Sequence, residues 1–135
     1  AVVISLFPPL VLGKIIDRIA GGNFPGFSMA AEYMHIGIPV LNKKPNMVYN
    51  EWGGFWVNES VDAYDYKIEY LKFEEGTPFP EILSKQPHVA YKVDDLDHYA
   101  ALAQQVIFGP LDLGPGVRLA FVIWDDAIIE LYEEK

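Results

Sequence analysis

The hydrophobic pattern divides the chain into an N-terminal segment with helical spacing and a longer part built mostly of strands. Residues 9–20 carry apolar side chains along one helix face, and Gly21–Gly22 mark its end. From residue 32 onward, apolar and polar residues alternate. Residues 32–40, 64–74 and 88–93 each predict a strand with one apolar face. Residues 47–58 predict two short strands that bend at Gly53–Gly54.

The second half of the chain adds one helix to this pattern. Asp94 or Asp95 is placed to cap it. Its apolar positions are Leu96, Tyr99, Leu102 and Val106. Three strands follow: a short one near residue 107, then residues 117–124 after a turn, and residues 127–133. The order β-α-β-β-β in this half, against strands alone in the first half, indicates a repeated unit whose first copy lacks its helix. The helix predicted over residues 9–20 is a candidate to cover the sheet face of the first half, where this unit lacks its own helix.

Composition and charge exclude several classes of function. The chain has 135 residues, enough for one domain, and a formal net charge of −9 without a basic cluster. Nucleic acid and anionic membrane surfaces are therefore not expected partners. The chain has no cysteine, which excludes disulfides and thiolate ligands, and we expect a cytoplasmic protein. Because Met29 opens a segment that would be complete by itself, we interpret residues 1–28 as an extension and residues 29–135 as the domain.

Four residues with metal-binding chemistry stand at equivalent places in the two halves. His35 and His88 lie in the first strand of each half, and Glu69 and Glu130 lie in the last. Each of them alone is more simply a structural histidine or a solvated carboxylate. A carboxylate within an apolar strand must nevertheless be exposed, paired or coordinated. Two imidazoles and two carboxylates suit a divalent ion such as Ni, Zn, Co, Mn or Fe.

The second half, PHVAYKVDDLDHYAAL followed by LAFVIWDDAIIELYE, resembles the glyoxalase/bleomycin-resistance/dioxygenase group, the vicinal oxygen chelate superfamily. The resemblance covers about residues 32–133, with modules at about 32–75 and 86–133. It implies an α+β fold in which paired βαβββ modules form a cupped mixed sheet, the first module being shortened and lacking its helix. It also implies that the metal ligands come from the first and last strand of each module. In this chain those positions are His35, Glu69, His88 and Glu130.

The resemblance implies a metal-dependent, glyoxalase-like lyase or isomerase acting on a small substrate with two vicinal oxygens. A bound metal would serve as the Lewis acid, and Glu69 or Glu130 would take the α-proton as general base. With Fe(II) the same geometry would suit oxygen chemistry. The alternative is a metal-free binding protein of the bleomycin-resistance type, which sequesters an aromatic or cationic small molecule. The net charge and the tryptophans favour this alternative, whereas the four metal-binding residues favour the enzyme.

Aromatic residues are the candidates for the walls of a ligand pocket, although aromatics on strands are often plain core. The pocket candidates are Trp52, Trp56, Tyr33, Phe121 and Tyr132. Since the first module is short, we also expect a second copy of the chain to complete the cup, which predicts a homodimer. A different curved sheet, a cone with a helix in its concavity, fits less well because the predicted helix comes late, between strands.

Overall fold

The computed structural model describes residues 31–63 and 65–135. The predicted extension and its helix lie outside these residues. The described part is mostly sheet, with one α-helix, α2 (Leu96–Leu102), and two short 3₁₀ helices, η1 (Val61–Ala63) and η2 (Glu81–Ser84). None of the described helices is long and apolar enough to span a membrane. The strands are β1 (Glu32–Pro39), β2 (Met47–Asn50), β3 (Phe55–Asn58), β4 (Ile68–Phe73), β5 (His88–Val93), β6 (Gln105–Gly114), β7 (Val117–Trp124) and β8 (Ala127–Glu134).

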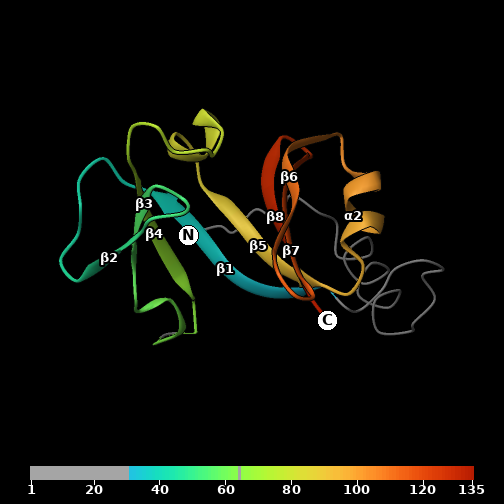
Figure 1. Cartoon of the computed structure of the whole chain (residues 1–135), viewed down its shortest axis with the longest axis horizontal. Helices are drawn as coiled ribbons and strands as arrows, with labels where there is room; N and C mark the ends of the chain where they lie inside the picture. The colour runs from blue at the N-terminus through green and yellow to red at the C-terminus, as the bar shows by residue number, and fades with distance from the viewer. Residues whose placement is uncertain (1–30, 64) are drawn as a thin grey trace, which may run out of the picture.

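All eight strands form one mixed sheet in the order β2-β3-β4-β1-β5-β8-β7-β6. The central strands β1 and β5 are antiparallel, while β1 pairs with β4, and β5 with β8, in parallel. Strands β2 to β4 lie to one side of this central pair and β6 to β8 to the other. The sheet curls into a half-barrel (Figure 1). Residues on the concave face of both sides therefore point toward a shared interior.

The alternation along β7 divides the core into two clusters. Leu119 and Phe121 belong to the cluster on the concave side, which also contains Phe79, Leu83 and Ile128. Ala120 and Val122 face the other way and belong to the cluster under α2, which also contains Val93, Leu96 and Leu131. This is the period-two pattern of a strand that is buried on both faces. Helix α2 thus covers the outer face of the second half and leaves the concave face free.

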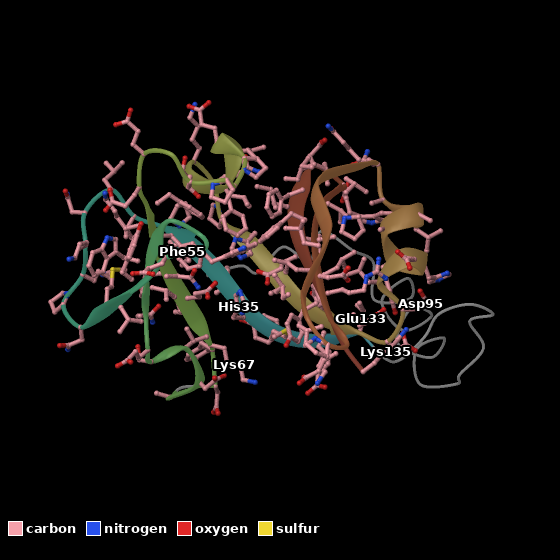
Figure 2. All side chains as sticks on the ribbon, in the orientation of Figure 1. His35, Phe55, Lys67, Asp95, Glu133 and Lys135 are labelled. Atoms are coloured by element: carbon pink, nitrogen blue, oxygen red, sulfur yellow. The ribbon has the colours of Figure 1, made fainter. Side chains whose placement is uncertain are left out.

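The start of α2 is held by two carboxylates. The Asp95 side chain accepts a hydrogen bond from the His98 amide at 3.0 Å, as predicted for a cap. The Leu96 amide donates to Glu133 Oε2 at 2.8 Å, which explains why Glu133 is a buried carboxylate on β8. Figure 2 shows Asp95 and Glu133 beside this helix.

The predicted helix was too long at its C-terminal end. It ends at Leu102, and Val106 lies in β6 opposite Val122 of β7. The Gln104 amide already donates to the Ile123 carbonyl, so pairing with β7 replaces the next helical turn. Strand β6 is correspondingly longer than the short strand expected near residue 107, because residues up to Gly114 also pair with β7.

Two local conformations set the faces of the site-bearing strands. Lys67 has φ 48°, which breaks the strand expected over residues 64–74, so that β4 begins at Ile68. The expected turn at Asp125–Asp126 joins β7 to β8 with both residues at positive φ, 51° and 61°. Positive φ at both central residues matches the twist of a two-residue hairpin. The turn fixes Trp124 opposite Ala127 and thereby places Glu130 opposite Phe121, on the concave face.

Candidate metal centre

The four candidate ligands come together on the concave face of the central strands. His35 lies on β1, Glu69 on β4, His88 on β5 and Glu130 on β8. Each offers one ligand atom, and these four atoms all lie within 4.8 Å of one another. Figure 2 shows His35 on β1, between the two sides of the sheet. Residues far apart in the sequence therefore form a single cluster of two imidazoles and two carboxylates.

Two small residues form the floor of this cluster. Gly37 on β1 lies opposite Glu69 on one side and opposite His88 on the other. Ala90 on β5 lies between His35 and Glu130 in the same way. The His88 ring lies directly over Gly37, since a Cβ built there would be 2.0 Å from its Cε1 atom. A side chain at Gly37 would therefore occupy space that the His88 ring uses.

The histidine nitrogens face the carboxylates without making ordinary hydrogen bonds. His35 Nε2 lies 2.9 Å from Glu69 Oε2 and 3.3 Å from Glu130 Oε2. His88 Nε2 lies 3.1 Å from Glu130 Oε2 and 4.0 Å from Glu69 Oε2. Both Nε2 atoms and His88 Nδ1 are buried, and within the described residues none of the three has a hydrogen-bond partner of acceptable geometry. Buried polar atoms without partners are rare, and a bound ion is one explanation for them.

The electrostatics of the cluster favour a charged His35 when no cation is bound. Burial of the His35 ring disfavours its charge, but the adjacent carboxylates of Glu130 and Glu69 outweigh this and raise its pKa to about 10. Burial likewise opposes the charge of Glu130, yet contact with His35 and His88 lowers its pKa to about 2. One positive imidazolium thus stands among two carboxylates, in the place that a metal cation would take.

A cavity of about 330 Å³ opens onto the cluster, and Glu69, His88 and Glu130 form part of its wall. Trp52 and Phe121, two of the predicted pocket residues, also line it. The remaining wall is mostly apolar and consists of Asn50, Phe55, Leu71, Phe73, Phe79, Leu113 and Leu119.

A second cavity, of about 540 Å³, reaches the cluster from another side. It is lined by His35 and Glu69 together with Tyr33, another of the predicted pocket residues. Its wall includes the charged residues Glu32, Glu59, Asp62, Lys67 and Lys92. Glu69 belongs to both cavities and therefore separates an apolar space from a polar one.

The other two predicted pocket residues line neither cavity. Trp56 lies opposite Lys72 on the outer face of the sheet, where its indole N–H donates to Glu74 Oε1 at 2.9 Å. Lys43 Nζ lies 3.3 Å from the centre of its ring. Tyr132 shares the concave face with Glu130 but lies two residues further along β8. It is half-buried there, opposite Lys92 of β5 and Leu119 of β7.

Phe73 and Phe79 are wall residues that the sequence interpretation missed. Phe73 follows Glu69 and Leu71 at strand spacing on β4, so the alternation itself could have identified it. Phe79 lies in the irregular loop after β4, between two prolines, where no periodic signal exists. Its ring contacts those of Phe55, Phe73, Phe121 and Trp52, with centroids 5.7 to 5.9 Å apart.

The donor set and its surroundings fit a divalent ion. Two nitrogen and two oxygen donors converge, and the Nε2 atoms of both histidines lack hydrogen-bond partners among the described residues. Gly37, which has no side chain, leaves room for the His88 ring. Two carboxylates and two neutral imidazoles balance the charge of such an ion.

Comparison of the sequence with models of known protein families finds no match, and comparison with curated proteins finds none either.

Proposed function

We propose that this protein is a metal-dependent lyase or isomerase of the glyoxalase type, acting on a small substrate with two adjacent oxygens. The convergence of His35, Glu69, His88 and Glu130 at the edge of a cavity carries this proposal. The four residues suit Ni, Zn, Co, Mn or Fe(II), and a bound ion would supply a Lewis acid that polarises the two substrate oxygens.

We assign the two carboxylates different roles, because their surroundings differ. Glu130 Oε2 lies within 3.3 Å of both histidine Nε2 atoms, so it is held on two sides. Glu69 Oε2 has one such short contact, to His35, and lies 4.0 Å from His88 Nε2. Glu69 also borders both cavities. Glu69 is therefore the better general base for removing a proton from the carbon next to a carbonyl, and Glu130 the fixed ligand.

The rest of the cavity would keep the reacting carbon away from bulk water. Phe121 packs its ring against that of His88, with centroids 5.2 Å apart, and both residues are buried. Such surroundings strengthen the interaction between a carboxylate and a developing charge, because the local dielectric constant is low.

The sheet order supports a place in the vicinal oxygen chelate superfamily. The strands on each side of the centre follow the same order, and each side contributes one histidine and one glutamate from strands that pair in parallel. Two βαβββ modules, the first without its helix, would produce this arrangement. In the described residues, the connection from β1 to β2 contains no helix, whereas α2 joins β5 to β6.

Exchange of the substrate α-proton with solvent tests the proposed chemistry. The metal-loaded protein is incubated in D₂O with hydroxyacetone or 2-hydroxyacetophenone, and NMR follows deuterium uptake at the hydroxyl-bearing carbon. Glu69→Gln, compared with the wild type at equal measured metal content, should lower the exchange rate by about 10²- to 10⁴-fold. Glu81→Gln on the exposed surface of η2 is the matched control and should exchange like the wild type. Exchange no faster than in buffer, with metal bound, would contradict the proposal.

A further inference from the structure

The apolar cavity beside the metal centre indicates what kind of substrate the site accepts. Its wall contains four phenylalanines, three leucines and Trp52, whereas Asn50 is its one polar residue outside the metal cluster. No lysine or arginine of the described residues lines it. A charged group placed there would lose its hydration without finding an opposite charge, which costs several kcal/mol.

The metal cluster does not supply a net charge to this cavity once it is loaded. The two carboxylates, Glu69 and Glu130, balance a divalent ion, and both histidines are neutral when they coordinate. As long as both carboxylates coordinate the ion, a cationic tail would find no free carboxylate among the described residues on the cavity side, and an anionic tail would find no cation there. The wall therefore favours an uncharged group.

The walls are held in place before any ligand binds. The Thr77 hydroxyl donates to the Gly53 carbonyl at 2.6 Å, and the Phe79 amide donates to Thr77 Oγ1 at 3.3 Å. These bonds tie the loop that carries Phe79 to the turn that carries Trp52. The Trp52 and Phe79 rings meet edge to face, with centroids 5.8 Å apart. A preformed aromatic wall gains affinity for a flat or branched apolar group because little order is lost on binding.

We propose that this cavity binds the uncharged aromatic or branched aliphatic tail of a substrate whose two adjacent oxygens meet the His/Glu cluster. The inference rests on the proposed function for the oxygen-bearing end and on the cavity wall for the tail. At about 330 Å³ the cavity is at the small end of ligand sites, so the tail is of the order of one ring. The tail that enters this cavity carries no carboxylate or phosphate, since no lysine or arginine of the described residues lines it.

Hydroxamates test the tail separately from the reaction, because they present two adjacent oxygens to a metal. Acetohydroxamate, benzohydroxamate, 4-carboxybenzohydroxamate and 4-(aminomethyl)benzohydroxamate are titrated by calorimetry into the Ni²⁺-loaded protein. Benzohydroxamate should bind about 10- to 100-fold more tightly than acetohydroxamate, because its ring leaves water. Both charged derivatives should bind at least about tenfold more weakly than benzohydroxamate does. Equal affinity for the first two probes, or tighter binding of either charged probe, overturns the inference.

Leu113 offers a variant that reverses the preference. It lines the cavity, but it is 43% exposed on β6, so a polar side chain is tolerated there. Leu113→Lys should bind 4-carboxybenzohydroxamate at least about tenfold more tightly than the wild type does, whereas Leu113→Gln should not. An unchanged ranking in Leu113→Lys shows that the tail lies elsewhere and contradicts the inference.

Failure of the proposed function is recognised separately. If calorimetry detects no binding of Ni²⁺, Zn²⁺, Co²⁺, Mn²⁺ or Fe²⁺, the metal-dependent function is wrong. The metal-free protein is then tested with benzyl alcohol, benzoate and benzylammonium by saturation-transfer NMR. Binding of benzyl alcohol alone still supports an uncharged tail in this cavity. Preferential binding of benzylammonium contradicts it and favours a site for cationic compounds.

Discussion

Replacing Gly37 with alanine should displace His88 from the metal centre although all four candidate ligands remain present. The new Cβ would lie 2.0 Å from His88 Cε1, 2.4 Å from Nε2 and 2.6 Å from Nδ1. Non-bonded heavy atoms need about 3.5 Å, so the ring must shift by roughly 1 to 1.5 Å. Because the ring also packs against Phe121 and His88 is 2% exposed, it has little space in which to move.

The magnitude of the effect follows from this geometry. Metal–ligand distances tolerate about 0.2 Å, so a ring displaced by an ångström no longer coordinates well. We expect the affinity for Ni²⁺ or Zn²⁺, measured by calorimetry, to fall by at least about 100-fold, which is the upper end of what disturbing an outer-shell partner costs. The free energy of unfolding of the metal-free protein, measured in urea, should fall by about 1 to 3 kcal/mol, as is typical of overpacking.

A double-mutant cycle separates the clash from other effects of Gly37→Ala. In a His88→Ala background the ring is gone, so the same substitution should cost little stability. Gly37→Ala binding metal with the affinity of the wild type would refute the geometry proposed for the centre. An equal loss of stability in both backgrounds would show that the ring of His88 does not lie over Gly37.

Three other measurements test separate parts of the structure. The pKa of His35 is raised to about 10, so this residue holds a proton at pH 7 that it must release in order to coordinate a metal. Calorimetry in buffers of different ionisation enthalpy should therefore detect release of about one proton per metal bound. The affinity for the metal should rise as the pH rises from 6 to 8. Absence of proton release would contradict the close contact between His35 and the two carboxylates. Glu133→Ala leaves the Leu96 amide without its acceptor and should lower the free energy of unfolding by about 1 to 3 kcal/mol, with unchanged metal affinity; metal loss would show that α2 and the centre are coupled. We also predict a homodimer, because the described part of the first half has no helix between β1 and β2 and a second copy of the chain would complete the cup. Light scattering should give twice the monomer mass, and a monomer would contradict this prediction.

The strands that carry the site could be predicted because their local patterns are strong. Residues 88–93 lie between Pro87 and the Asp94–Asp95 cap, and β5 has these bounds. The strand over residues 117–124 ends at a turn, and β7 ends there too. The equivalent places of the four metal-binding residues indicated that they meet, and the pairing of β1 with β4 and β5, and of β5 with β8, brings them together.

The pocket was harder to predict, because a wall depends on contacts between distant segments. On β3 the concave face carries Phe55 and Val57, so Trp56 faces outward, and a shift of one residue would have reversed this. Alternation gave Tyr132 the correct face, but it cannot say how far along a strand a cavity extends. Phe79 enters the wall through a loop, and the end of α2 is set by pairing with β7, neither of which leaves a local trace.

The most direct test of the central claim is the amount of metal bound per chain. The protein is purified without chelator, equilibrated with Ni²⁺ or Zn²⁺ and dialysed. Its metal content is then measured by elemental mass spectrometry. If His35, Glu69, His88 and Glu130 form one site, the wild type should hold about one equivalent, and Glu130→Gln together with His88→Ala should hold almost none. A wild type that retains no metal, or a variant that retains as much as the wild type, would contradict the metal centre.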